Sequence, residues 1–490
     1  MEFKYKSQLK EINSMAIPIF TTYLLELIFT VMDQAIIGRT SVDAFAAVGI
    51  VSSLIYGITG SLGVSSMAFS ILFAKSIGEG NEKKQGRLFS TAITLSIILG
   101  IIIELITICF GKQFLKNFYA LNGDILQYAW DYMYISTIGV GINLLLFVFL
   151  SYFKNIKKVR VCLYTTVIST PINLFLDWCL VFGKYGFPKL GVKGAAIGTV
   201  TGLFCSILVS LIFYKKYKRI SYRLHINKVE LKEILKLFIP MSIQDFIQCT
   251  LFAILIMSIV SQLGTNKVAT FNLLLSIISI VTFSMYAYAG SASILVSQAN
   301  GRNNKKDKKL YPILATLCSL FFTIIVSIII IVNPTILCKV ITNDINLIES
   351  AGIFMMYAIG IQLFNLVQEV YKSTLLGLLC EKWVLIYSTI ISIIMIGIIY
   401  FIAIVMKMNL TGVWLGLGLN YFILATGYII KFNKHERLSK INWSWLRMGW
   451  CYEFINAKCK VLNKKYVHEL GHAVHYYIMN KNLPLRYAEF

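Results

Sequence analysis

Apolar residues run along this chain in long segments, which short polar and basic stretches separate. A helix needs about 20 apolar residues to cross a bilayer, so each segment predicts one membrane span. The predicted spans are 15–38, 49–74, 90–111, 127–150, 160–183, 193–214, 236–262, 268–299, 311–333, 350–379, 384–406 and 411–431. The pattern therefore predicts an all-α membrane protein with twelve transmembrane helices.

Composition agrees with this prediction. Of 490 residues, 57% are hydrophobic and only 14% are charged, which excludes an ordinary soluble chain. The net charge of +23 could indicate nucleic-acid binding, but the basic residues gather in alternate connections, for example at 154–160, 215–223 and 302–309. Such a distribution is typical of cytoplasmic loops. We therefore expect a multi-pass protein of the bacterial plasma (inner) membrane, with both termini cytoplasmic and no nucleic-acid partner.

The two halves of the chain resemble each other. Pro18 precedes Gly78 of "KSIGEGNEKK" by 60 residues, and Pro240 precedes Gly301 of "QANGRNNKKDKK" by 61. "LGVKGAAIG" opens the sixth predicted span and "LTGVWLGLG" opens the twelfth. Chance similarity of glycine-bearing apolar segments is the alternative, but the spacing favours a duplication, which is a recurring transporter architecture. The expected parts are an N-terminal six-helix bundle (1–214), a cytoplasmic linker (215–235), a C-terminal six-helix bundle (236–435) and a cytoplasmic tail (436–490).

Polar side chains within the fifth predicted span indicate a cation site. Asn173 and Asp177 are four residues apart and therefore lie on one helix face. Pro171 leaves the carbonyl of Val167 without its usual helical donor. Together with Asp33 of the first span, these oxygens suit one hard monovalent cation or a shared proton. The alternative is that Asn173 and Asp177 only form hydrogen bonds to neighbouring helices.

Other polar residues in the spans are weaker candidates. Glu26 precedes Asp33 by seven residues, so both lie on nearly the same helix face. The candidates for lining a cavity are Glu26, Asp245, Gln248, Gln368 and Glu369, and interhelical polar contacts explain the last four equally well. Pro18 and Pro171 are candidate hinges because proline interrupts helical hydrogen bonding.

Three segments carry a resemblance to a known family. "IPIFTTYLLELIFTVMDQAIIGRTSVDAFAAVGI" (17–50), "INLFLDWCLVFGKYGFPKLGVKGAAIG" (172–198) and the repeated "GEGN" and "GRNN" turns resemble the multidrug and toxic compound extrusion (MATE) transporters, over roughly residues 10–435. The resemblance implies a V-shaped pair of six-helix bundles that exports organic, cationic, lipophilic compounds in exchange for Na⁺ or H⁺. It further implies a monomer in the lipid bilayer that takes a small-molecule substrate, is not an enzyme and needs no cofactor beyond the coupling ion.

The resemblance also assigns residues. The family's cation site in the first bundle corresponds to Asp33, Asn173 and Asp177, and Thr199 is the nearest candidate for a threonine that often joins it. One branch of the family uses a glutamate in the seventh helix. Gln248 stands at that place here, which favours coupling through the first bundle.

The C-terminal tail contains a different motif. His468, Glu469 and His472 form an HExxH pattern, and the segment resembles the zinc-binding helix of thimet and oligoendopeptidase F-type peptidases. A third protein ligand and a domain to hold it are missing, so we expect only adventitious zinc at His468 and His472. Two alternatives to export thus stay open: a lipid-linked oligosaccharide flippase of the same superfamily, and a membrane-anchored zinc metallopeptidase.

Overall fold

The computed structural model describes residues 5–436 except 222, 335–337, 340–341 and 343. Within these residues, twelve helical segments are long and apolar enough to cross a membrane, as the sequence predicts. Residues up to Phe432 form one compact unit, which contains all of these segments apart from the last turn of the twelfth.

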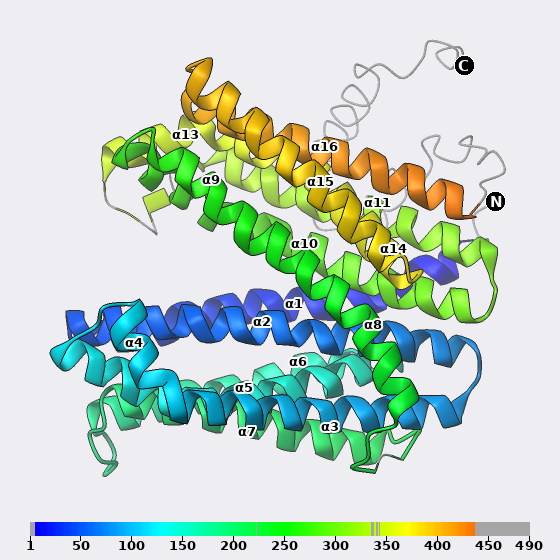
Figure 1. The fold of residues 1–490 in the computed structure, drawn as a ribbon, viewed down its shortest axis with the longest axis horizontal. Coiled ribbons are helices and arrows are strands. Elements are labelled where there is room, and N and C mark those ends of the chain that lie inside the picture. The colour runs from blue at the N-terminus through cyan, green and yellow to red at the C-terminus, as the bar shows by residue number, and fades with distance from the viewer. Residues whose placement is uncertain (1–4, 222, 335–337, 340–341, 343, 437–490) are drawn as a thin grey trace, which may run out of the picture. The chain divides into compact units, whose positions relative to one another are not determined.

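The first six spans form one bundle (Figure 1). They are α1 (Lys6–Gly38), α2 (Val42–Gly78), α3 (Glu82–Ile106), α5 (Gly123–Asn155), α6 (Arg160–Phe182) and α7 (Val192–Lys216). The third span continues beyond α3 through the π-helical turn η1 (Thr107–Gly111) into α4 (Lys112–Phe118). Within this bundle α5 contacts α2, α3 and α7, and α6 packs between α1 and α7.

The last six spans form the second bundle, in which the seventh and tenth spans are interrupted. The seventh consists of α8 (Lys228–Asp245), the π-helical turn η2 (Phe246–Leu251) and α9 (Phe252–Ser261). The eighth is α10 (Thr265–Gly301), the ninth is α11 (Lys305–Val332), and the tenth consists of α13 (Ile345–Gly360) and α14 (Gln362–Gly377). The eleventh is α15 (Glu381–Tyr400), which ends in the π-helical turn η3 (Phe401–Val405), and the twelfth is α16 (Asn409–Glu436). The sequence predicts one uninterrupted span over 350–379, but the helix breaks between Gly360 and Gln362. Glycine has a low helix propensity, which explains the position of the break.

The helices extend beyond the apolar runs because polar residues cap them. Ser41 caps α2, which begins at Val42 although the predicted span begins at 49. Asn81 accepts a hydrogen bond from the backbone N–H of Lys84 at 3.0 Å, and Asn304 accepts one from that of Asp307 at 3.1 Å. The asparagines of the repeated GEGN and GRNN turns thus both begin helices, α3 and α11.

The repeated glycines form a close crossing between the halves. Gly78 at the end of α2 lies against Gly301 at the end of α10, and a methyl group on either glycine would lie 2.9 Å from the Cα atom of the other. Backbones can approach this closely only where side chains are absent. Beside this crossing, a continuous hydrophobic core includes residues of both halves, among them Ala74, Leu88, Leu295 and Leu376.

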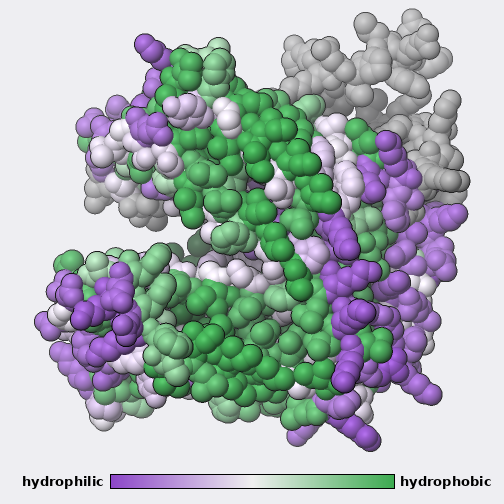
Figure 2. All heavy atoms as spheres, in the orientation of Figure 1, coloured by the Kyte–Doolittle hydropathy of each residue, from purple (hydrophilic) through white to green (hydrophobic). Residues whose placement is uncertain are grey.

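Away from this crossing, the halves have separate cores. One core lies wholly in the first half and includes Ile37, Ala47 and Tyr132. Another lies wholly in the second half and includes Phe271 and Trp414. We call the end of the molecule with Gly78 and Gly301 the joined end. Figure 2 shows hydrophilic side chains along the joined end and a hollow between the halves at the opposite end.

Replacing Gly78 with alanine should destabilise the protein. The new methyl group would overlap the backbone of α10, and overpacking of this kind costs about 1–3 kcal/mol. The matched control is Gly60→Ala, also on α2, where a Cβ atom meets nothing within 4 Å. We expect the apparent Tm in detergent to fall for Gly78→Ala and to stay or rise for Gly60→Ala. Equal Tm values for both variants would contradict the proposed tight crossing.

Candidate cation site and comparison with known proteins

A buried polar cluster lies in the first bundle, away from the joined end. Asp177 of α6 is fully buried, with 0% of its surface exposed. Its Oδ2 atom accepts a hydrogen bond from Nδ2 of Asn173, one turn earlier, at 2.8 Å. The i, i+4 spacing thus brings the two side chains together, as the sequence predicts.

Two glycines of α7 make room for this pair. A methyl group on Gly198 would lie 2.9 Å from Cγ of Asp177, and one on Gly202 would lie 2.7 Å from Cβ of Asn173. Gly198 and Gly202 are themselves four residues apart, so they form a smooth strip on the face of α7 that meets the polar strip of α6. The sequence analysis missed these glycines, although their matching spacing is visible in "GTVTG".

Asp33 of α1 completes the cluster. Its carboxyl group lies within hydrogen-bonding reach of that of Asp177. The Oδ1 atoms of both residues are buried, and no hydrogen bond reaches either from the described residues. Two ionised carboxylates at this separation repel each other, so the arrangement favours a proton or a cation between them.

Tyr132 of α5 is a further member of the cluster. This buried residue lies near enough to Asp33 and Asp177 for their charges to act on its hydroxyl group. The hydroxyl also accepts a hydrogen bond from Ser52 of α2 at 3.3 Å. Neither residue follows from the sequence alone, because the approach of Tyr132 to the acids and of Ser52 to Tyr132 depends on how four helices pack.

Other predicted members of the first-half site lie apart from it or play no visible part. Thr199 is half-buried beside Gly198, and none of the hydrogen bonds described for residues 5–436 joins it to Asp177. Both α1 and α6 continue through their prolines, Pro18 and Pro171. The roles of Thr199 and of the two hinges therefore stay predictions.

Glu26 has a different environment from the one we expected. The charge that acts on it is that of Lys154 in the last turn of α5, which also acts on Tyr23 and Cys162. The sequence analysis assigned Lys154 to a loop, but it belongs to the helix. Glu26 therefore belongs to a second charged group in the first half, and its role in lining a cavity stays a prediction.

The second half contains a largely buried ion pair on α14. Nζ of Lys372 lies 2.6 Å from Oε2 of Glu369, and their side chains are 14% and 13% exposed. Tyr286 of α10 and both Tyr421 and Tyr428 of α16 interact with this pair. The sequence analysis proposed Glu369 without noticing Lys372, which lies three residues later and on the same helix face.

The remaining candidates of the second half are engaged by neighbours. Asp245 accepts a hydrogen bond from Sγ of Cys249 at 3.4 Å, and Gln248, in the π-helical turn η2, accepts one from Gln244. Gln368 is buried. Cys249 interacts with Asp245 and also with the Glu369–Lys372 pair, so Asp245 lies in the neighbourhood of that pair.

The HExxH motif, with His468, Glu469 and His472, lies outside the described residues.

Comparison with known proteins identifies the family. The sequence profile of the family described as MatE matches residues 18–179 and 240–402. This chain belongs to the MatE family. The two matched segments of this MatE member begin at Pro18 and Pro240, the prolines that open the predicted repeat, and this supports the duplication.

Relatives of this MatE member match it over most of its length. It is 25% identical over 420 residues to "Probable multidrug resistance protein NorM" of Thermotoga maritima, which covers 83% of this chain and 88% of that one. It is 24% identical over 442 residues to a protein of the same name from Bacillus cereus, covering 88% and 96%. The outward-facing structure of a multidrug resistance MATE family transporter of the MOP superfamily has the same fold, with a TM-score of 0.79, 17% identity and coverage of 88% and 96%.

The Glu369–Lys372 pair predicts a specific pattern of stability in this MatE member. Lys372→Met leaves Glu369 buried without a cation, and breaking a buried pair in this way costs about 3–5 kcal/mol. Replacing both residues, as Lys372→Met with Glu369→Gln, removes the unpaired charge and should recover much of the loss. The measurement is the apparent Tm of the wild type, of Lys372→Met, of Glu369→Gln and of the double variant. Lys215→Met, which replaces an exposed lysine, is the control. A single Lys372→Met variant as stable as the wild type would contradict the pairing.

Proposed function

We propose that this MatE member is a secondary active exporter of the multidrug type, driven by a cation that enters through the first bundle. The observation that carries the proposal is the meeting of Asp33, Asn173 and Asp177 inside the membrane-spanning part, where two acids face each other. In the described part of the chain no lysine or arginine acts on these two acids. Acids in membrane spans that lack a protein cation are typical of ion and proton sites.

The membrane potential can supply the energy. Moving one elementary charge across 100 mV releases about 2.3 kcal/mol. This free energy maintains a substrate gradient of about fiftyfold, because each 1.4 kcal/mol corresponds to a factor of ten. One cation per substrate is therefore sufficient for modest efflux. Both Na⁺ and H⁺ suit two carboxylates and an amide, and Asp33, Asp177 and Asn173 would be the groups that take either ion.

The direction of transport in the proposal rests on the joined end. If the basic connections are cytoplasmic, the halves are in contact on the cytoplasmic side and the Asp33 cluster lies toward the outer side. Protons or sodium ions could then enter the cluster from outside while substrate leaves. The proposal thus includes a bacterial plasma-membrane location, cytoplasmic termini and a monomer that performs no covalent chemistry.

The expected substrates are organic, lipophilic compounds, in keeping with the multidrug resistance for which the NorM relatives are named. A preference for cations rests on fewer acids than the sequence indicated, because Lys154 acts on Glu26 and Lys372 pairs with Glu369. A lipid-linked oligosaccharide flippase would need a cavity with an excess of basic groups to meet pyrophosphate. Lys154 and Lys372 each have an acidic neighbour, so these lysines give a cavity no excess of positive charge. The charges therefore favour export of organic compounds over transport of a pyrophosphate-linked lipid.

Asp177→Asn should abolish cation-driven export. The substitution keeps the size of the side chain and one acceptor oxygen, which the hydrogen bond from Asn173 can still use, but removes the charge that a cation would neutralise. The measurement is ethidium efflux from vesicles that contain the full chain, under imposed sodium and proton gradients. Glu104→Gln is the matched control, since it alters another acid within a span of the first half. Full ethidium export by Asp177→Asn under either gradient would refute the proposed role.

The same vesicles distinguish the two coupling ions. If Na⁺ is the coupling ion, an inward sodium gradient should drive efflux at equal pH on both sides; if H⁺ is, an inward proton gradient should do so in sodium-free buffer. Dependence on neither gradient would contradict secondary active transport.

A chain that ends at residue 435 should transport as well as the full chain, because the proposed site lies entirely before that residue.

A further inference from the structure

The connection between the two bundles forms a pocket against the first one, at the joined end. The described residues of the connection, 217–221 and 223–227, run along the beginning of α3, and together they line an open pocket of about 1010 Å³. Two hydrogen bonds hold the connection in place: the backbone N–H of Arg223 donates to Oγ of Ser90 at 3.1 Å, and that of Asn227 donates to Oγ1 of Thr91 at 3.2 Å. The connection is therefore held against the helix beside this open pocket. We call it the linker pocket.

The walls of the linker pocket are strongly basic. They include four cationic side chains, those of Lys83, Arg87, Arg219 and Arg223. One carboxylate, Glu82, and His225 also line the pocket. Arg87 forms an ion pair with Glu230 at 2.6 Å. For Lys83, Arg219 and Arg223, the part of the chain that the structure describes contains no ion pair. Like charges repel, so three such cations around one cavity favour an anion within it.

The position of the linker pocket points to the kind of anion. The cavity lies where α3 begins, at Glu82, and shortly after α7 ends, at Lys216. Ends of membrane-spanning helices lie at the level of the lipid headgroups. Leu224, also in the wall, is 68% exposed, so an apolar side chain stands next to the arginines. Basic pockets at this level bind the phosphates of anionic lipids, and the guanidinium fork matches phosphate geometry.

We propose that the linker pocket binds the phosphate of an anionic phospholipid headgroup through Arg219, Arg223 and Lys83. These residues come from the connection on one side and from α3 on the other, so a bound phosphate joins the two. The site is separate from the Asp33 cluster and does not depend on the coupling mechanism. No step of the proposed transport cycle uses these residues.

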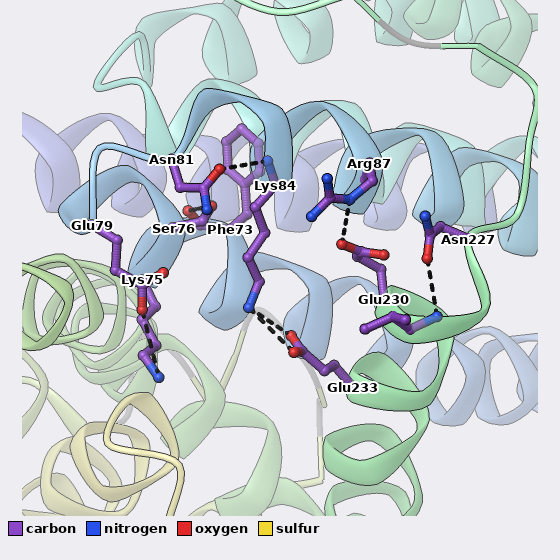
Figure 3. A network of polar contacts seen from close by, with 11 residues as sticks. Phe73, Lys75, Ser76, Glu79, Asn81, Lys84, Arg87, Asn227, Glu230 and Glu233 are labelled. Atoms are coloured by element: carbon purple, nitrogen blue, oxygen red, sulfur yellow. Dashed lines mark hydrogen bonds and ion pairs between the residues drawn. The ribbon is translucent and has the colours of Figure 1, made fainter.

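Occupation of the linker pocket would affect the contact between the bundles. Beyond the connection, α8 is held to α3 by the ion pairs Lys84–Glu233, at 2.9 Å, and Arg87–Glu230 (Figure 3). Since α8 contacts α2 in the first half and α15 in the second, it belongs to both sides of the joined end. A phosphate that fixes the connection against α3 therefore also favours the arrangement in which the halves meet at this end.

The test measures stabilisation of the purified full chain by lipid. Phosphatidylglycerol should raise the apparent Tm in detergent, and phosphatidylcholine, which has no net charge, should not. In Arg219→Gln/Arg223→Gln, the apparent affinity for phosphatidylglycerol should fall about tenfold or more, because two charge-assisted contacts are lost. The matched control is Arg160→Gln/Arg302→Gln, which removes two exposed arginines at the same end but outside the pocket. Equal loss of affinity in both double variants would overturn the proposal.

Two further arms complete the test. If inorganic phosphate without lipid gives the full stabilisation, the site takes free phosphate and the assignment to a headgroup is wrong. Arg219→Lys/Arg223→Lys keeps both charges, which protects against misfolding, but loses the forked donors. Native mass spectrometry should then show fewer phosphatidylglycerol molecules retained than by the wild type. Unchanged retention by this variant and by the glutamine variant would refute the site.

Discussion

The structure depends on one constraint: a charged side chain within a membrane span must be neutralised, because hydrocarbon does not solvate it. Three charged groups in the spans meet this requirement in two ways. Glu369 has the ammonium group of Lys372 within 2.6 Å, and Glu26 is acted on by Lys154. Asp33 and Asp177 face each other instead. Lysine supplies the positive charge in the first two groups, so the third is the one that an external cation or proton is best placed to complete.

The duplication explains why the two bundles meet where they do. Each copy carries a glycine immediately before its turn and an asparagine cap immediately after it, and the two glycines cross at the joined end. The polar sites did not stay equivalent. The first bundle has paired aspartates, whereas the second has a glutamate that its own lysine neutralises. A shared backbone plan therefore carries two different electrostatic arrangements, and this difference supports the proposal that the coupling ion binds in the first bundle.

Much of the fold could be predicted from sequence, because apolar run length and the distribution of basic residues are local properties. The pairing of Asn173 with Asp177 also follows from spacing within one helix. The break after Gly360 was missed, since the apolar pattern continues across it. Contacts between helices were harder: Tyr132 reaches the acids only through the packing of α5 against its neighbours, and Glu26 meets Lys154 across two helices. Lys372 was visible in the sequence, but only its pairing reveals why it is tolerated.

The position of α1 suggests how an ion at the cluster can influence the whole molecule. Near its beginning, α1 is bound to the second half: Asn13 accepts a hydrogen bond from the hydroxyl of Tyr288 at 2.6 Å, and Glu11 accepts one from that of Tyr311 at 2.5 Å. Near its other end, the same helix carries Asp33 to the cluster with Asp177. A displacement of the helix at Asp33 strains its contacts with α10 and α11 unless α1 bends at Pro18, the candidate hinge between the two places. Under the proposed function, α1 is thus the element that links the acids, where an ion would bind, to the contacts at the joined end.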